Sequence, residues 1–169
     1  MTYRGKLLLV FVCLCAGVIQ NGCKKGGNKK EQLIDGPGTP SIEFTYVPQI
    51  GSRDNLKGRA SHILASQYKV AVRIQVDGGW WTKPYDYDPY VSIRSDGTFK
   101  CDITTGGIDE QAFKIVALLV SADTPLIALE GTGVIPDVIL QYKVAEADAD
   151  RTNFDEYERV QGFEPVWVT

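Results

Sequence analysis

YKVAVRIQV, at residues 68–76, is the stretch that decides the predicted fold class. Its even-numbered positions are all apolar or aromatic, whereas Lys69, Arg73 and Gln75 occupy odd-numbered positions. Because side chains alternate between the two faces of a strand, this period of two indicates a β-strand and not a helix. The purity of the alternation predicts an antiparallel strand with one packed face and one face in solvent.

Further short extended segments flank this strand on both sides. The segments expected from their apolar patterns are residues 41–47, 91–94, 98–103, 113–120, 138–144 and 165–168. A tight turn is expected at residues 95–97 (Ser-Asp-Gly), because glycine accepts the positive φ that such turns need. Asp109 could cap a short helix, but the β-branched Ile115 and Val116 favour a strand after a brief turn. Seven or more short strands with turns between them predict an all-β, Ig-like antiparallel β-sandwich.

The amino-terminal residues have the order of a bacterial lipoprotein export signal. Basic residues precede an apolar run at 7–19, and the small residue Gly22 precedes Cys23. A helix over that run spans about 20 Å, short of the roughly 30 Å hydrocarbon core of a bilayer. We therefore predict a cleaved leader at residues 1–22 and lipidation of Cys23. The cleavage motif before Cys23 looks like the less strict motifs of Bacteroides-type lipoproteins. The alternative is an ordinary cleaved signal with an incidental cysteine.

The residues after the leader divide into a tether and one domain. Residues 23–40 are rich in Lys, Gly, Asn and Pro, which predicts a lipidated flexible tether. Residues 41–169 remain for a single β-sandwich domain. The expected partner of the anchor is a membrane of the cell envelope, with the outer membrane as the expected location. The lysines after Cys23 leave both the periplasmic and the outward face open.

Charge and motifs exclude several classes of function. The chain has 18 basic and 21 acidic residues, and its one dense basic run lies in the tether, so nucleic acid is not an expected partner. No motif for a catalytic triad, a zinc protease or a phosphate loop occurs around the single histidine, His62. We expect no enzyme activity, no cofactor and no metal site. Residues 102–107 carry oxygen ligands that Ca²⁺ would accept, but their Asp-Thr-Gly pattern is typical of turns. Cys101 is expected to be a small buried hydrophobe.

An aromatic stretch, GGWWTKPYDYDPY at residues 78–90, follows the decisive strand. Two adjacent tryptophans on an extended chain face opposite sides, so one can fill the core while the other is exposed. Exposed rings offer flat apolar surfaces to sugars, and neighbouring polar groups can bond sugar hydroxyls. The candidate ligand-binding residues are Trp80, Trp81, Lys83, Tyr85, Asp86, Tyr87, Asp88 and Tyr90. The alternative is that these side chains brace the core and a long loop; a glycosidase pair at Asp86 and Asp88 is a weaker alternative.

Three motifs carry a family resemblance: WWTKP at 80–84, SDGTF at 95–99 and DITTGG at 102–107. Over residues 56–121 the chain resembles an accessory Ig-like, carbohydrate-binding-like β-sandwich module of Bacteroides-type secreted and surface lipoproteins. Such modules often accompany glycan-degrading enzymes. Taken with the leader and the aromatic stretch, the resemblance leads us to expect a membrane-anchored, non-catalytic lipoprotein that binds a glycan through the 80–90 loop. A structural or protein-interaction component of a cell-envelope complex is the alternative.

Overall fold

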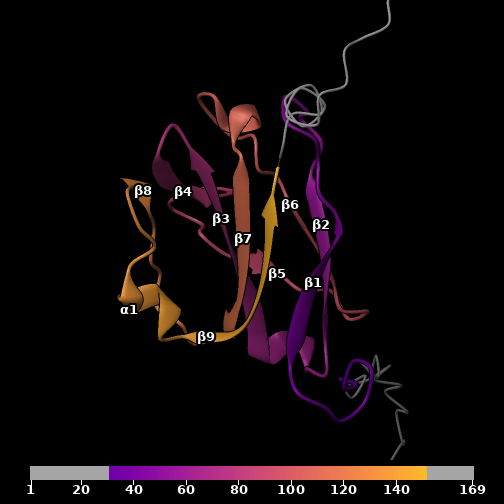
Figure 1. The fold of residues 1–169 in the computed structure, drawn as a ribbon. Coiled ribbons are helices and arrows are strands. Elements are labelled where there is room, and N and C mark those ends of the chain that lie inside the picture. Colours follow the sequence, from indigo (N-terminus) through magenta and orange to yellow (C-terminus); the bar gives the residue numbers. More distant parts are fainter. Residues whose placement is uncertain (1–30, 152–169) are drawn as a thin grey trace, which may run out of the picture.

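The computed structural model describes residues 31–151 and shows two antiparallel sheets packed face to face (Figure 1). The predicted all-β sandwich is confirmed. The smaller sheet has the order β1 (Ser41–Tyr46), β2 (Leu56–Ser61), β6 (Thr98–Cys101). The leader, Cys23 and the strand expected at 165–168 lie outside the described residues.

The larger sheet carries the functional stretch. Its order is β8 (Glu130–Thr132), β4 (Gly79–Lys83), β3 (Tyr68–Val76), β7 (Lys114–Ser121) and β9 (Lys143–Asp150), with β5 (Val91–Ser92) also paired to β3. Three short helical turns connect these strands: η1 (Ala65–Gln67), η2 (Asp109–Gln111) and α1 (Asp137–Leu140). The turn η2 precedes β7, so the prediction of a brief turn followed by a strand is confirmed.

A core fills the space between the sheets. It is built from apolar side chains of β2, β3, β6 and β7, among them Leu56, Val72, Ile74, Phe99 and Ile115. Cys101 belongs to this core and is 1% exposed, as expected of a small hydrophobe. Burial raises the pKa of its thiol to about 12, so the thiol stays protonated and unreactive at neutral pH.

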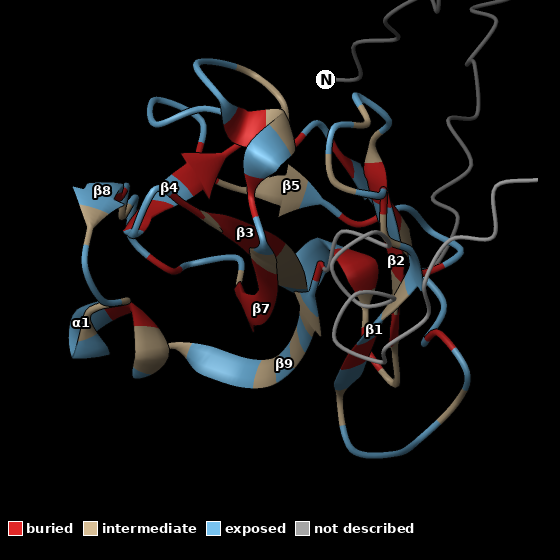
Figure 2. Ribbon diagram, turned by 45° about the horizontal axis from the view of Figure 1, so that its top comes forward, coloured by how far each residue is buried: buried red, intermediate tan, exposed pale blue. Residues whose placement is uncertain are grey.

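The strand β3 is buried on both faces, and the expectation of one solvated face is wrong. Figure 2 shows β3 and β7 as largely buried, because residues 122–142 cover the second face of the sheet. Arg73 is fully buried there and donates hydrogen bonds of 2.8 Å to the carbonyls of Val72 and Ile127. Burial lowers the pKa of its guanidinium to about 10. A polar residue in an alternating pattern can thus be buried where backbone carbonyls accept its hydrogen bonds.

The strand expected at 138–144 is wrong at its start. Residues Asp137–Leu140 form α1 after Pro136, and the strand β9 begins only at Lys143. Ile135, Ile139 and Tyr142 pack against the second face of the larger sheet at a spacing of four and three residues, which is the spacing of a helical face. The apolar residues of this segment alternate as in a strand, but they also fit a helical turn, which is what the chain forms here.

The tight turn at residues 95–97 is confirmed, with Gly97 at φ +86° and its N–H bonded to the carbonyl of Arg94. The two strands that it separates lie in different sheets. β5 pairs with β3 in the larger sheet, whereas β6 pairs with β2 in the smaller one. This turn therefore carries the chain from one layer of the sandwich to the other.

The packed body includes residues before Ser41. Ile34 is 6% exposed, and its backbone exchanges two hydrogen bonds of 2.9 Å with His62 and Ile63. Asp35 forms an ion pair of 2.8 Å with Arg59 on β2. The described end of the expected tether is thus held against the smaller sheet.

Candidate functional site

The two adjacent tryptophans of β4 lie on opposite faces of the larger sheet. Trp80 is 8% exposed and packs in the cluster beneath residues 122–142, whereas Trp81 is 40% exposed. Trp81 pairs with Ile74 of β3, and residues in register share a face, so its ring projects on the side of the smaller sheet. The core covers Ile74 completely but leaves much of Trp81 in solvent. Trp81 is therefore the exposed ring of the pair.

A stacked tyrosine pair lies on the loop after β4. The rings of Tyr85 and Tyr87 have centroids 5.1 Å apart and planes inclined by 7°. They are 42% and 75% exposed, and the carboxylate of Asp86 between them accepts a 2.9 Å hydrogen bond from the Tyr87 N–H. The loop therefore presents two parallel rings to solvent near Trp81.

Two hollows share Trp81, Lys83 and Gly106 in their lining, and we call them together the Trp81 groove. The Ile108 hollow has a volume of about 310 Å³, and its lining includes Val76, Asp77, Gly107, Ile108 and Asp109. The Tyr85 hollow has a volume of about 380 Å³, and its lining includes Pro84, Tyr85, Asp86, Thr105 and Glu130. The Trp81 groove thus joins an exposed indole, a tyrosine ring and several carboxylates.

Lys83 takes part in the floor of the Trp81 groove and is hardly exposed. Its ammonium group forms a buried ion pair with Asp109, and each side chain is 7% exposed. The same ammonium donates to the Thr105 hydroxyl at 3.2 Å, and Asp109 also accepts from the Gly106 N–H at 2.8 Å. These bonds fix residues 105–109 beside β4 and so shape the wall that faces Trp81.

The remaining predicted site residues lie away from the groove or only at its border. Tyr90 packs with Trp80 on the second face of the sheet, where its hydroxyl donates to the carbonyl of Pro125. The ammonium of Lys69 lies 4.0 Å from the centre of the Tyr90 ring. Asp88 is exposed on the loop. The structure therefore brings Trp81, Lys83, Tyr85 and Asp86 together in one lining, adds Tyr87 through stacking, and separates Trp80 and Tyr90 from them.

Sequence reasoning missed several contributors to the groove, of which Ile108, Glu130 and Gly131 lie around Trp81. Ile108 is 52% exposed, and Glu130 pairs with Trp81 across the β4–β8 ladder. Gly131 has φ +69°, and a Cβ built on it would lie 3.0 Å from Cζ2 of Trp81. The Gly-Thr-Gly run at 131–133 was the available signal for a close approach, but only the β4–β8 pairing shows which ring it accommodates.

Residues 102–107 form a turn held by their own side chains. The Asp102 carboxylate accepts hydrogen bonds of 2.9 and 3.1 Å from the N–H and hydroxyl of Thr104. Within residues 31–151, no three side chains of the metal-ligating kinds are grouped so that they could hold an ion. The same part of the chain contains no helix of the length and apolarity needed to cross a membrane.

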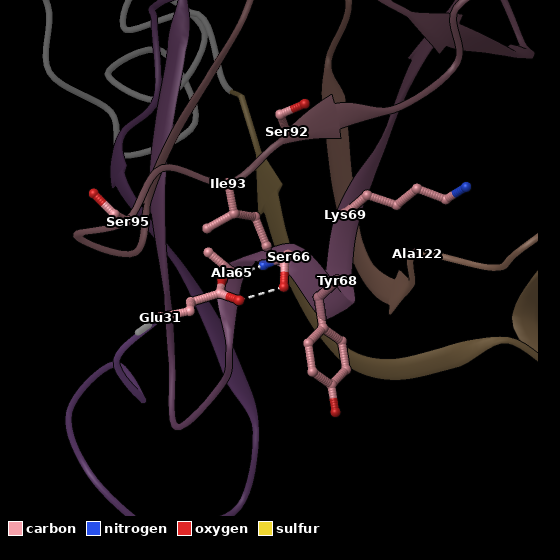
Figure 3. A pocket seen from close by; sticks show the side chains of 9 residues that line it. All are labelled: Glu31, Ala65, Ser66, Tyr68, Lys69, Ser92, Ile93, Ser95 and Ala122. Carbon is pink, nitrogen blue, oxygen red and sulfur yellow. Dashed lines mark hydrogen bonds between the residues drawn. The ribbon is translucent and has the colours of Figure 1, made fainter. Parts of the chain in front are cut away.

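A third hollow, of about 440 Å³, lies where β3 begins (Figure 3). Its two charged side chains, Glu31 and Lys69, already form hydrogen bonds within the protein. The Glu31 carboxylate accepts a 2.6 Å bond from the Ser66 N–H and a second bond from the Ser66 hydroxyl, and these bonds lower the pKa of Glu31. Lys69 extends away from Glu31 and donates to the carbonyl of Thr124 at 2.7 Å. This hollow is therefore a weaker candidate than the Trp81 groove.

Comparison of the chain with protein-family models, with curated proteins and with solved structures found no match. The residues of the groove and their chemistry are therefore the basis for a functional proposal.

Proposed function

We propose that this chain is a membrane-anchored, non-catalytic lipoprotein that binds a glycan through the Trp81 groove. The observation that carries the proposal is the 40% exposed indole of Trp81 with a hollow on each side. Sugar rings present C–H faces that pack on aromatic rings, and a single exposed ring between two open hollows suits such stacking.

Polar groups beside the rings supply the hydrogen bonds that a sugar needs. The carboxylates of Asp86 and Glu130 line the Tyr85 hollow, whereas the hydroxyl of Thr105 there already donates to the carbonyl of Pro84 and accepts from Lys83. Carboxylates accept hydrogen bonds from hydroxyl groups, and such charge-assisted bonds are stronger than neutral ones. The combination of an apolar ring face and nearby acceptors supports a carbohydrate over a purely apolar ligand.

The binding test compares two variants with matched loss of aromatic surface. Trp81→Ala removes the ring of the groove, and Tyr46→Ala removes an equally exposed ring, 40%, from the smaller sheet. Using the full-length chain on immobilised polysaccharides, we expect Trp81→Ala to bind at least about tenfold more weakly, a loss of about 1.4 kcal/mol. Tyr46→Ala should bind like the wild type. If wild type and Trp81→Ala bind equally, or neither is retained on any polysaccharide, the proposal is wrong.

The anchor has a separate test, because it rests on the leader and Cys23. Labelled palmitate fed to the expressing cells should enter the chain. Cys23→Ser should abolish the label, and Cys101→Ala, which alters a buried thiol, should leave it unchanged. Fractionation of the same cells should place the wild-type chain with the outer membrane, and protease added to intact cells distinguishes the outward from the periplasmic face.

A second candidate function is supported by exposed apolar side chains on the segment that covers the second face of the sheet. Leu126, Val134 and Val138 on this segment are 71%, 70% and 51% exposed, and Val144 on the following strand β9 is 45% exposed. A contiguous apolar patch is typical of a surface that another protein covers. If cross-linking in cells captures an envelope protein, and Leu126→Asp with Val134→Asp abolishes capture while Trp81→Ala does not, the protein-interaction alternative is favoured.

A further inference from the structure

We infer that the Trp81 groove takes the interior of a glycan chain that carries no anionic groups and excludes anionic polysaccharides. This inference rests on the proposed function and adds the class of ligand. The charges of the floor and rim support it, as does the contribution of Trp81 to the lining of both hollows.

The floor of the groove carries charges that cancel. Among the described residues that line the two hollows, Lys83 is the only basic one, and its ammonium group is paired with Asp109. Both side chains are 7% exposed, and further bonds to Thr105 and Gly106 occupy them. A carboxylate or sulfate on a ligand therefore finds no free cation among these residues.

The rim of the groove is acidic. Asp77 is exposed at the Ile108 hollow, and Asp86 and Glu130 are exposed at the Tyr85 hollow. Charges separated by less than the Debye length of about 8 Å at physiological salt interact without full screening. An anionic polymer laid across Trp81 would meet these carboxylates at both ends of its contact, so like-charge repulsion disfavours it.

The ligand must also be long enough to pass over the indole. The two hollows share Trp81 and Gly106, and each also has lining residues of its own: Ile108 in one, Tyr85 in the other. A single sugar can occupy one hollow only, whereas a chain can use both and stack on Trp81 between them. We therefore assign the groove to an internal segment of a polymer.

The test measures retention of the full-length chain on immobilised polysaccharides of three kinds: neutral β-glucan and galactomannan, anionic alginate and polygalacturonate, and cationic chitosan. Each polymer is tested with the wild type, with Trp81→Ala and with the charge variant Asp86→Asn/Glu130→Gln. The control for the charge variant is Glu43→Gln/Asp148→Asn, which removes two exposed charges from other strands. We expect Trp81-dependent binding of a neutral polymer that changes less than about twofold between low salt and roughly 0.5 M salt. The charge variant, and not its control, should raise retention on the anionic polymers by about fivefold or more.

The outcomes separate this inference from the proposed function. Trp81-dependent binding of alginate or polygalacturonate by the wild type at low salt would overturn the inference and leave glycan binding intact. Retention on chitosan that falls at high salt would support the acidic rim. Competition with free sugars tests the assignment to a chain interior. If a fivefold excess of the monosaccharide displaces the protein from a neutral polymer as effectively as the hexasaccharide does, that assignment is wrong. Retention on none of the polymers would overturn both proposals.

Discussion

The ammonium group of Lys83 and the carboxylate of Asp109 form a buried ion pair that joins β4 to the turn before β7. Removal of one partner leaves an uncompensated charge in the interior, which costs about 3–5 kcal/mol. We therefore expect Lys83→Met to lower the free energy of unfolding by about that amount, as measured by urea denaturation.

A double variant separates the ion pair from simple packing. Lys83→Met/Asp109→Leu replaces both charges by apolar groups, and such replacements are often neutral. The double variant should recover most of the stability that Lys83→Met loses. If the loss of stability in the double variant equals the sum of the losses in Lys83→Met and Asp109→Leu, the two residues are not energetically coupled.

The approach of Gly131 to Trp81 predicts a second effect on stability. Gly131→Ala places a Cβ 3.0 Å from Cζ2 of Trp81 on a backbone with φ +69°, so both strain and crowding oppose it. We expect a loss of about 1–3 kcal/mol in the free energy of unfolding and weaker glycan binding. Gly78→Ala is the matched control, because its φ of +76° brings similar strain while a Cβ there has no neighbour within 4 Å. Equal effects of the two substitutions would contradict the close packing of Trp81 on Gly131.

The different environments of the two tryptophans predict that loss of Trp80 lowers mainly stability and that loss of Trp81 lowers mainly ligand binding. Trp80→Ala removes a buried ring and should cost about 3–5 kcal/mol. Trp81→Ala removes a 40% exposed ring and should cost about 1 kcal/mol or less while it abolishes ligand binding. Urea denaturation and polysaccharide retention measured on the same preparations check both halves. A large loss of stability in Trp81→Ala would indicate a structural role for that ring.

Acid should weaken the attachment of residues 34–36 to the smaller sheet. Hydrogen bonds from Ser61 and then Arg59 hold the pKa of Asp35 below its ordinary value of 3.8. Because the folded-state pKa is the lower one, this contribution to stability is present above 3.8 and is lost as pH falls through the lowered pKa. The urea midpoint of Asp35→Asn should therefore vary less than that of the wild type between about pH 5 and pH 2. Equal pH dependence in the two proteins would contradict the shift.

The period of two at residues 68–76 was enough to predict a strand and, with its neighbours, the sandwich. It was not enough to predict what covers the strand, because alternation records polarity and not the partners that a polar group finds. Arg73 bonds the carbonyl of Ile127, more than 50 positions away, and no local pattern encodes that meeting. The same limit explains α1, whose apolar residues fit both a strand and a helical turn until the covered face is known.

The candidate site was predicted in part. The adjacency of Trp80 and Trp81 required one ring on each face, but which of them is exposed depends on how far the smaller sheet extends over β4. Ile108 and Glu130 reach the groove from distant segments, and their contribution required the fold. Lys83 was expected to meet a ligand, and its pairing with Asp109 depends on a turn 26 positions further along the chain.

The placement of Trp80 and Trp81 on opposite faces has a practical consequence. Trp80 is buried and Trp81 is exposed, so their emission should respond differently to solvent, and a Trp167→Phe background leaves these two as the tryptophans of the chain. A water-soluble quencher such as acrylamide should then extinguish mainly the Trp81 signal. A sugar bound on Trp81 would protect its emission from the quencher and leave the emission of Trp80 unchanged. Ligand binding could then be followed by fluorescence, with the neighbouring Trp80 as the internal reference.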